Sequence, residues 1–204
     1  MHEKKADAGE RVLLSQDEAR FALIPTLRAT LGVKGHRPLV GHLDCHASLY
    51  LYGALNLVTG HLTTRLVERP RKTRTSTMSK RRYLQEAFAK HLRDIARASP
   101  ATHHPRIVLV VDNASWHQGK AIDEVLTVFP HLELYPLPSY SPQLQVIEHF
   151  WKVLRRRATH NRLFQTIAQL KRTLRHNLCY YQTLKQRVLS VIQAQRKRTK
   201  LSAA

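Results

Sequence analysis

The sequence predicts an α/β fold, in which a mixed five-stranded sheet is flanked by helices and followed by a basic helical extension. Short apolar runs typical of strands lie at 11–18, 49–55, 61–67, 107–111 and 132–135. Segments with apolar residues at helical spacing separate the later runs, and only this spacing continues near the C-terminus. We expect a polar lead at 1–10, a main domain at 11–160 and the extension at 161–204.

The most unusual feature of the composition is its charge, because 34 Lys and Arg against 14 Asp and Glu give a net charge of +20. Solubility alone does not need this imbalance, and a nucleic acid is the natural partner, although basic ribosomal or membrane-surface proteins look similar. The polar N-terminus and the lack of a ~20-residue apolar run predict a cytoplasmic protein without membrane association. Cys45 and Cys179 lie outside any zinc or disulfide pattern.

The first strand carries an acidic side chain on an otherwise apolar run. Val12 and Leu14 lie on one face of this strand, while Ser15 and Asp17 lie on the other. A buried aspartate is costly unless it has a partner or a metal ion. From these residues alone, a ligand role for Asp17 and a solvated strand end are equally open.

The next two strands should form a hairpin. The apolar run 49–55 is followed by Thr59-Gly60, after which 61–67 continues as a second run. A glycine at this point is typical of a hairpin turn, so the first three strands should form an antiparallel meander. Asp44, on the approach to the hairpin, is better interpreted as a loop-edge side chain than as a metal ligand.

A basic segment leads into the first helix. Residues 69–82 contain no acid, and Ser79 is a suitable N-cap for a helix that Pro100 would end. A basic loop before a helix most often contacts phosphate, although a solvated loop is the plain alternative. The nucleic-acid contacts predicted here are Arg71, Lys72, Arg74, Lys80, Arg81 and Arg82.

The run 107–111 is β-favouring throughout and does not alternate, which suits a central strand covered on both faces. Asp112 follows at its carboxyl end, where α/β folds bind their ligands. A helix is expected over 118–128, with Asp123 and Glu124 on its solvent side. Asp112 is therefore the best functional candidate among these three acids.

A short strand at 132–135 precedes another helix, for which Ser141 is a suitable N-cap and Pro142 suits the first helical position. Apolar residues then recur at helical spacing and place Glu148 on the second turn, at the margin of the apolar stripe. Glu148 is interpreted either as a ligand or as the partner of Lys152 in a helix ion pair worth about 0.2–0.5 kcal/mol.

From His149 to the C-terminus the chain has no acidic residue, against 14 Lys and Arg. Apolar residues recur at helical spacing from Leu163 to Ile192, so one long helix or two in succession should bury an apolar stripe and leave a cationic face. The segment 195–200 should fray. Further phosphate contacts are predicted at His117, which alternatively caps the helix after it, and at Lys152, Arg155, Arg156 and Arg157.

Three sequence blocks together resemble a known family. They are Asp17-Glu18-Ala19-Arg20-Phe21, Val111-Asp112-Asn113-Ala114-Ser115-Trp116-His117, and Leu137-Pro138-Ser139-Tyr140-Ser141-Pro142-Gln143-Leu144 leading to Ile147-Glu148-His149-Phe150-Trp151-Lys152. Their order, with 35 residues between Asp112 and Glu148, is similar to that in the DDE transposases of the mariner-like insertion-sequence superfamily. The resemblance extends over about residues 11–176.

The resemblance implies a ribonuclease-H-like fold and assigns catalysis and metal binding to Asp17, Asp112 and Glu148. It also implies a nucleoid-associated bacterial enzyme that cuts and joins double-stranded DNA at insertion-sequence ends as a homodimer, with two Mg²⁺ or Mn²⁺ ions. Two such ions about 3.5–4 Å apart can activate water and stabilise the leaving oxygen. Carboxylate oxygens are the ligands that these hard ions prefer.

Two departures from the family pattern leave alternatives open. Gln145-Val146 stands where the family usually has Asn-Pro, and the chain begins almost at the first catalytic strand. We therefore expect the family's N-terminal helix-turn-helix domain to be missing, and a separately encoded helix-turn-helix protein to be a partner. A catalytically inactive nucleic-acid-binding remnant is the main alternative, and a nuclease for RNA–DNA hybrids is the third.

Overall fold

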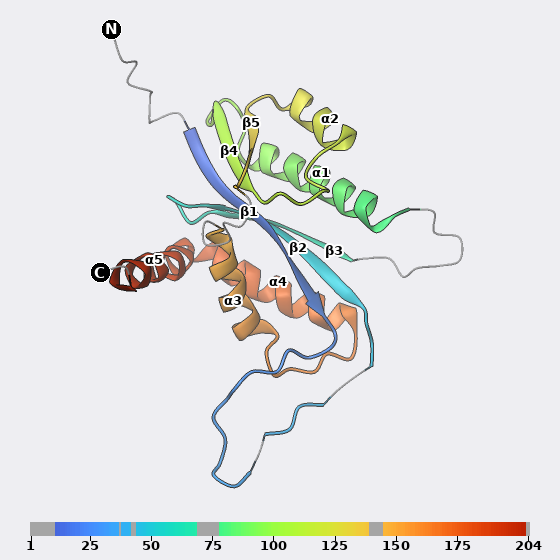
Figure 1. Ribbon diagram of the computed structural model, residues 1–204, viewed down its shortest axis with the longest axis vertical. Coiled ribbons are helices and arrows are strands. Elements are labelled where there is room, and N and C mark those ends of the chain that lie inside the picture. The colour runs from blue at the N-terminus through green and yellow to red at the C-terminus, as the bar shows by residue number, and fades with distance from the viewer. Residues whose placement is uncertain (1–10, 37, 42–43, 69–77, 139–144, 203–204) are drawn as a thin grey trace.

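The computed structural model describes residues 11–36, 38–41, 44–68, 78–138 and 145–202, with side chains described up to residue 193. At its centre is a five-stranded sheet in the spatial order β3-β2-β1-β4-β5 (Figure 1). The strands are β1 (Arg11–Ala22), β2 (Ser48–Asn56), β3 (Leu62–Glu68), β4 (Arg106–Val111) and β5 (Leu132–Pro136). The first three pair antiparallel, while β4 runs parallel to β1 and β5 parallel to β4, which confirms the mixed sheet and the meander.

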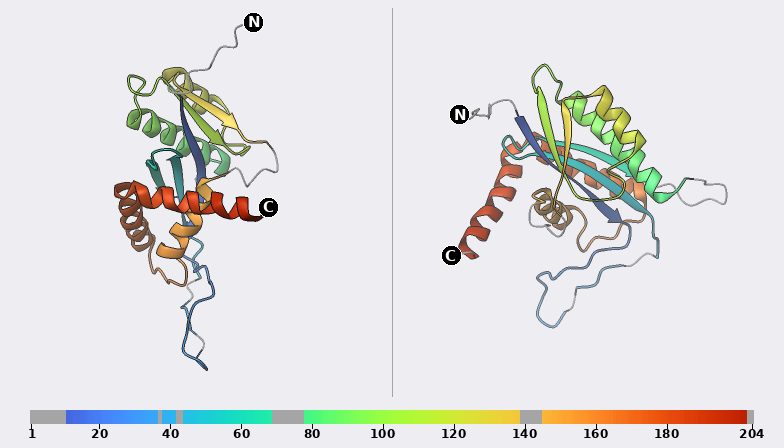
Figure 2. Two further views of the ribbon diagram at one scale, coloured as in Figure 1. Left: turned by 90° about the vertical axis from the view of Figure 1, so that its left-hand side faces the viewer. Right: turned by 45° about the horizontal axis from the view of Figure 1, so that its top comes forward.

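Helices cover both faces of the sheet in a three-layer arrangement (Figures 1 and 2). One layer consists of α1 and α2, and the other of α3 and α4, with α5 extending sideways from the second layer. Their bounds are α1 (Lys80–Ala98), α2 (Lys120–Val128), α3 (Ile147–Ala158), α4 (Ile167–Thr183) and α5 (Lys185–Ser202). In the described ranges, no helix combines the length and the apolar character needed to cross a membrane.

The hairpin between β2 and β3 closes where the sequence predicted it. The side chain of Asn56 accepts hydrogen bonds from the backbone N–H groups of Val58 and Thr59, each at 2.9 Å. Gly60 has a φ of 71°, a conformation that glycine adopts without a steric penalty. The local chemistry of this turn therefore fixes the register of the two strands.

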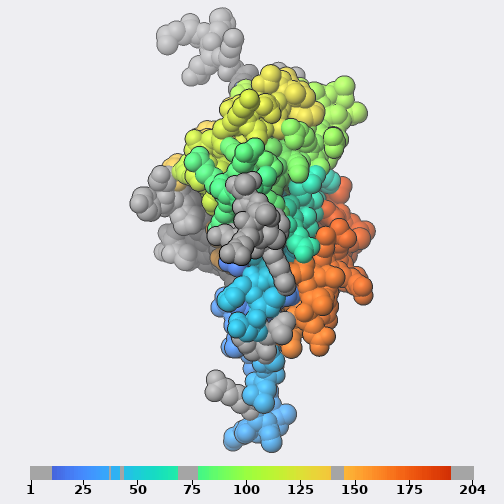
Figure 3. All heavy atoms as spheres, turned by 90° about the vertical axis from the view of Figure 1, so that its right-hand side faces the viewer, coloured from blue at the N-terminus to red at the C-terminus, as the bar shows by residue number. Residues whose placement is uncertain are grey.

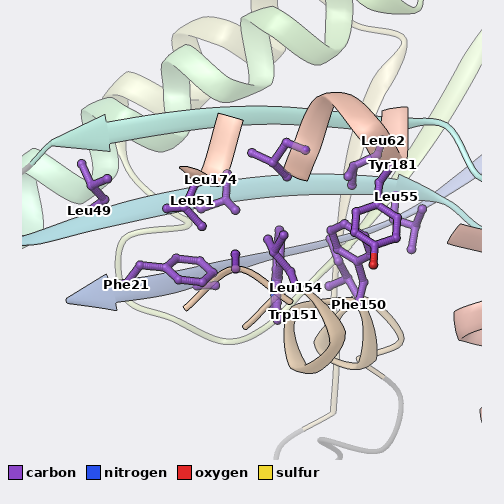
Figure 4. Packing of buried hydrophobic residues seen from close by; sticks show 14 of the residues in the cluster. Phe21, Leu49, Leu51, Leu55, Leu62, Phe150, Trp151, Leu154, Leu174 and Tyr181 are labelled. Atoms are coloured by element: carbon purple, nitrogen blue, oxygen red, sulfur yellow. The ribbon is translucent and has the colours of Figure 1, made fainter. Parts of the chain in front are cut away.

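Apolar side chains on the two faces of the sheet form two separate cores. On the α3 side, β1 and β2 pack against α3 and α4, with the labelled members Phe21, Leu49, Leu51, Leu55, Leu62, Phe150, Trp151, Leu154, Leu174 and Tyr181 (Figure 4). On the α1 side, the core includes Leu14, Tyr52, Phe88, Leu92, Ile107, Leu109 and Val111. Helices α4 and α5, which belong to the basic extension, contribute to the same core as α3.

Two expectations about individual elements were wrong. Strand β4 buries Ile107, Leu109 and Val111, but Val108 and Val110 are only half-buried, because α3 and α4 pack over β1, β2 and β3 instead. Helix α3 begins at Ile147, so Glu148 lies in its first turn and not its second. The residues expected to start the helix, 141–142, lie outside the described part of the chain.

The C-terminal stripe forms two helices in succession, as one of the two alternatives predicted. Thr166 caps α4 by accepting from the backbone N–H of Gln169 at 3.1 Å. Leu163 and Leu184 were expected in the buried stripe, but they lie in the connections between helices and are 37% and 43% exposed. The segment 195–200, which was expected to fray, is helical as part of α5.

The connection between β1 and β2 projects from the body of the molecule (Figures 1 and 3, blue to cyan). Within it, Leu31 and Leu39 are 99% and 93% exposed. Near the body, the segment is fixed to the end of α3, where the backbone N–H of Asn161 donates to the carbonyl of Thr26 at 3.1 Å. The projecting part therefore starts from a well-anchored base.

Candidate catalytic carboxylate site

Asp17 and Asp112 lie on neighbouring parallel strands. Ser15 of β1 is paired with Val110 of β4, and continuing this register by two residues brings Asp17 level with Asp112. Adjacent strands lie about 4.8 Å apart. Asp112 follows the last residue of β4, so Asp17 and Asp112 occupy neighbouring backbone positions at the carboxyl end of that strand, where the sequence predicted a site.

The start of α3 is anchored to β1 beside Asp17. The side-chain amide of Gln145 donates to the backbone carbonyl of Gln16 at 3.0 Å, and the backbone N–H of Ile147 donates to the hydroxyl of Ser15 at 3.3 Å. Both contacts are buried. Gln145, one of the departures from the family pattern, therefore helps to hold the first turn of α3, and with it Glu148, against the strand that carries Asp17.

The side chain of Trp151, on α3, supports the carboxylate of Asp17. The indole N–H of Trp151 donates to Oδ2 of Asp17 at 3.1 Å, while its rings pack in the core. Gly53 is paired with Asp17 in the sheet, and a Cβ at this glycine would lie only 2.5 Å from Cη2 of Trp151. A residue without a side chain is therefore needed at position 53 to admit the indole.

Asp17 lies in a strongly unfavourable environment for a charged carboxylate. Burial, followed by the negative charges of Glu18, Asp112 and Glu148, raises its pKa to about 7, against a lowering effect of the Glu18 backbone N–H. The charges of Asp112 and Glu148, like that of Glu18, are thus close enough to Asp17 to act on its carboxylate.

Arg155 is a cation of α3 on which the charges of this region act. It follows Glu148 by two helical turns, and its half-buried guanidinium lies 5.3 Å from the centre of the Phe21 ring. Burial lowers its pKa, while the charges of Asp17 and Glu148 raise it. Arg155 therefore offsets part of the negative charge of the site without forming a direct ion pair among the described residues.

On the opposite face of β1, Glu18 forms a buried network with the loop that follows Asp112. The indole N–H of Trp116 donates to Glu18, and Nε2 of His117 lies 3.3 Å from the other carboxylate oxygen. Nδ1 of His117 lies 2.9 Å from Oδ1 of Asp112. The side chains of His117 and Glu18 are only 4% and 9% exposed.

The charge state of this network follows from its hydrogen bonds. Burial alone would lower the pKa of His117, but its hydrogen bonds to Asp112 and Glu18 and the charge of Glu18 raise the pKa to about 10. His117 is therefore a buried imidazolium that donates from both nitrogens. Its hydrogen bond is in turn the main cause of a lowered pKa at Asp112, which keeps that carboxylate ionised.

The sequence did not reveal this network. His117 was expected to contact phosphate or to cap the next helix, whereas the structure joins it to two carboxylates, and Glu18 was not singled out at all. One signal was present, because Glu18 follows Asp17 on a strand and must therefore point to the opposite, helix-covered face.

Comparison with known protein families shows to which family the chain that carries this site belongs. The profile of the family described as DDE superfamily endonuclease matches residues 12–171. The chain belongs to this family. The match includes Asp17, Asp112 and Glu148, and it extends from β1 into the first turns of α4.

Two curated relatives of this DDE-family chain come from bacteria. The insertion element IS630 uncharacterized 39 kDa protein of Shigella sonnei is 25% identical over 169 residues, which cover 83% of this chain and 45% of that protein. The uncharacterized protein y4pE/y4sA of Sinorhizobium fredii is 34% identical over 80 residues, 39% of this chain and 55% of that protein. The chain therefore spans about half the length of the curated relatives it matches.

Solved structures of the Mos1 mariner transposase share the fold. The Mos1 mariner paired end complex with Mn has a TM-score of 0.58 at 18% identity, covering 89% of this chain and 53% of that one. The catalytic domain of Mos1 mariner transposase has a TM-score of 0.53 at 14% identity, covering 89% and 78%. The predicted ribonuclease-H-like fold is thereby confirmed for this member of the DDE family.

The DDE-family carboxylates fit a divalent metal ion in their donor chemistry. Asp17, Asp112 and Glu148 offer hard oxygen ligands, and a cation would offset the burial and the repulsion that together raise the pKa of Asp17. The described residues nevertheless contain no group of three His, Cys, Asp or Glu side chains gathered as a ready-made metal site. The contacts of Asp112 with His117 and with the backbone N–H of Ala114 both use Oδ1.

The predicted DNA contacts lie in different surroundings. Lys80, Arg81 and Arg82 are exposed at the start of α1, and Nε of Arg81 donates to the carbonyl of Ser115, in the loop after Asp112, at 3.2 Å. On α3, Lys152, Arg156 and Arg157 are exposed, and the guanidinium of Arg157 lies 4.0 Å from the centre of the Tyr180 ring. The positions Arg71, Lys72 and Arg74 lie outside the described residues.

Proposed function

We propose that this chain is the catalytic part of a transposase that cuts and joins DNA at insertion-sequence ends. The observations that carry the proposal are the match of the chain to the DDE family and the action of the Asp112 and Glu148 charges on Asp17. Similar solved structures include the Mos1 transposase paired-end complex with left transposon end and the Mos1 Strand Transfer Complex. Those names describe Mos1, and they support DNA ends and target DNA as the substrates of this chain.

The metal ions of the proposed reaction are two Mg²⁺ or Mn²⁺, held by Asp17, Asp112 and Glu148. When bound, such ions supply an activated water and stabilise the leaving 3′ oxygen of an in-line displacement. Structures of the Mos1 paired end complex with Mn and with Mg support these ions as cofactors.

The residues around the carboxylates prepare them for this task. His117 keeps Asp112 ionised, because a buried imidazolium beside it favours the charged form. Trp151 orients Asp17, and the anchoring of Gln145 and Ile147 to β1 positions Glu148. Rigid support of this kind reduces the rearrangement needed when the substrate and ions bind.

DNA is proposed to lie across the carboxylates and contact the basic residues of α1 and α3. The structure supports this placement at Arg81, which already touches the loop after Asp112, and at the exposed positions Lys152 and Arg156. A homodimer on DNA and a separately encoded helix-turn-helix partner complete the proposal. Because phosphate contacts release counterions, binding should weaken steeply as salt is added.

Cleavage of duplex DNA in the presence of Mg²⁺ or Mn²⁺ tests the proposal. The wild-type protein should cut, and Asp112→Asn should bind DNA with wild-type affinity without cutting it. Full activity of Asp112→Asn would contradict the proposal. The same assay with an RNA–DNA hybrid tests the third alternative, since a hybrid nuclease would cut the hybrid in preference to the duplex.

The second candidate is a DNA-binding remnant without catalytic activity. One observation favours it, namely that the described carboxylates are not gathered into a closed ligand set. It predicts DNA binding by the wild-type protein without metal-dependent cleavage at any concentration of Mn²⁺.

A further inference from the structure

One part of the sheet lies outside both hydrophobic cores. Helices α3 and α4 pack over β1, β2 and β3 (Figure 1), and four apolar side chains of β1, β4 and β5 belong to neither core: Leu13, Val108, Val110 and Tyr135. Leu13 and Tyr135 are 44% and 55% exposed, and the two valines are half-buried. These four side chains form a shallow apolar surface, the open sheet face.

The strand register places the four side chains on one surface. Val108 pairs with Leu13 of β1, and Val110 pairs with Tyr135 of β5. Paired residues of neighbouring strands point to the same face, and so do residues two positions apart on one strand. Ser15, which also pairs with Val110, accepts a hydrogen bond from the backbone at the start of α3. The open sheet face therefore lies on the α3 side of the sheet, beside the first turn of that helix.

The open sheet face is continuous with the carboxylate site. Asp17 follows Ser15 by two residues on β1, and Asp112 follows Val110 by two residues at the end of β4. A strand rises about 3.3 Å per residue and neighbouring strands lie about 4.8 Å apart, which puts the Cα atoms of Tyr135 and Asp112 about 8 Å apart. A DNA strand held at Asp112 can therefore reach Tyr135.

Tyr135 is unusual among the aromatic residues of the protein. It is the one exposed aromatic residue of the described ranges, where all the others are buried or half-buried. A single exposed apolar side chain is common on protein surfaces. Tyr135 differs because its neighbours on the open sheet face, Val108 and Val110, are themselves apolar and half-buried. A flat ligand can therefore cover the tyrosine ring and the valines together.

Backbone contacts fix the position of Tyr135 relative to Asp112. The backbone N–H of Leu137 donates to the carbonyl of Val111 at 2.8 Å, and the side-chain amide of Asn113 donates to the carbonyl of Leu137 at 2.6 Å. The end of β5 is thereby joined to the residues on either side of Asp112. A surface that is held in place before its ligand arrives loses less entropy on binding.

The charges at the end of the open sheet face remote from Asp112 favour a polyanion. Arg11 and Arg106 pair with each other in the sheet and precede Leu13 and Val108 by two residues, so they belong to the same face. Glu133, which pairs with Val108, is neutralised by an ion pair with Arg106 at 2.6 Å. Arg11 forms no ion pair within the described part of the chain, so one positive charge remains.

We propose that the open sheet face binds an unpaired stretch of the DNA strand beside the cleavage point, with one base stacked on Tyr135. This inference rests on the proposed function and names the form of DNA that the site takes up. An aromatic ring among apolar side chains suits the flat face of a base, which a paired duplex keeps inside its own stack. From Arg106 to Asp112 the strand rises about 20 Å, which is enough for about six stacked nucleotides.

The test compares the binding of two labelled DNAs in the absence of divalent metal ions. One is a blunt duplex, and the other is the same duplex with a single-stranded tail of about six nucleotides. Tyr135→Thr removes the ring and keeps a residue that suits a strand. It should bind the tailed DNA about tenfold more weakly than wild type and the blunt duplex equally well. Val128→Thr, at an exposed position on α2, is the matched control and should bind both DNAs as wild type does.

Two further measurements separate stacking from other effects. Tyr135→Phe keeps the ring and should bind the tailed DNA like wild type. A fluorescent adenine analogue in the tail should lose intensity on binding to wild type and to Tyr135→Phe, because stacking on an aromatic ring quenches it, and should lose much less on binding to Tyr135→Thr. Thermal unfolding checks that all variants are folded. A Tyr135→Phe protein that binds the tailed DNA as weakly as Tyr135→Thr would contradict stacking.

The remaining outcomes distinguish this inference from the proposed function. Equal affinity of wild type and Tyr135→Thr for the tailed DNA would overturn the inference and leave the proposed function intact, whereas a wild-type protein that binds neither DNA would overturn both. The other occupant of such a face is a second copy of the chain. If Tyr135→Thr converts a dimer of the free protein to a monomer in sedimentation and keeps the wild-type affinity for the tail, the face is an interface between copies and the DNA assignment is wrong.

Discussion

Asp17 and Glu18 are consecutive acids on one strand, yet the two faces of the sheet treat them in opposite ways. On the α3 side, Asp17 receives one side-chain hydrogen bond, from Trp151, and burial together with repulsion by three other carboxylates raises its pKa to about 7. On the α1 side, Glu18 accepts hydrogen bonds from Trp116 and from a buried imidazolium, His117. The fold therefore compensates the charge of Glu18 with two donors and leaves the charge of Asp17 largely uncompensated.

This difference separates two roles. A carboxylate that the protein leaves in an unfavourable state is a candidate to bind a cation from outside, whereas a carboxylate with two internal donors is a structural partner. Asp112 connects the two sides, since His117 bridges it to Glu18. The Glu18 side therefore supports the Asp17 side through the loop after β4.

The largest expected effect concerns DNA cleavage. Asp17→Asn removes a proposed metal ligand and should abolish metal-dependent cleavage, whereas Glu18→Gln removes only a supporting contact and should reduce the rate by about 10–100-fold. Cleavage of a labelled duplex under single-turnover conditions measures both. Equal losses of cleavage rate in the two variants would contradict the distinction between a metal ligand at Asp17 and a supporting residue at Glu18.

The next effect concerns stability on the compensated face. His117→Gln leaves Glu18 buried without its cation and should lower the free energy of unfolding by about 3–5 kcal/mol, while the exposed His176→Gln should have little effect. Because the folded-state pKa of His117 is about 10, above that of the unfolded chain, the stabilisation is fully present below about pH 6.5. Denaturant unfolding should show the difference between variant and wild type narrowing as the pH rises towards 10.

Removing the charge of Asp17, on the α3 side of the sheet, should change the free energy of unfolding in the opposite direction. Folded Asp17 has a pKa of about 7 against 3.8 in the unfolded chain, so ionisation destabilises the fold progressively from about pH 4 to pH 7. Asp17→Asn should therefore raise the free energy of unfolding by about 2–4 kcal/mol at pH 8 and leave it nearly unchanged at pH 4. A destabilised variant at pH 8 would contradict the electrostatic account of Asp17.

The smallest expected effect on stability concerns the packing of the Trp151 indole against Gly53. Gly53→Ala places a methyl group against Trp151 and should lower the free energy of unfolding by about 1–3 kcal/mol. Trp151→Phe lacks the clashing ring atoms, so the cost of Gly53→Ala should largely disappear in the Trp151→Phe background. Denaturant unfolding of the four proteins of this cycle measures the coupling.

Several features were predictable because their signals are local in sequence. The strands followed from alternation and turn glycines, Ser79 capped α1 as expected, and the three acids lay in the blocks that resemble the DDE transposases. The start of α3 was not predictable, because it is set by contacts of Gln145 and Ile147 with the distant strand β1. The Glu18–His117 pair likewise joins residues 99 positions apart.

Calorimetric titration with Mn²⁺ at pH 8 tests the central claim most directly. Wild-type protein should bind Mn²⁺ with a measurable heat, and Asp17→Asn should lose that heat, while Glu18→Gln should retain it with weaker affinity. Wild-type affinity should also fall as the pH drops below about 7, since protons then compete for Asp17. Binding of Mn²⁺ by Asp17→Asn with wild-type heat and affinity would contradict the assignment of Asp17 as a metal ligand.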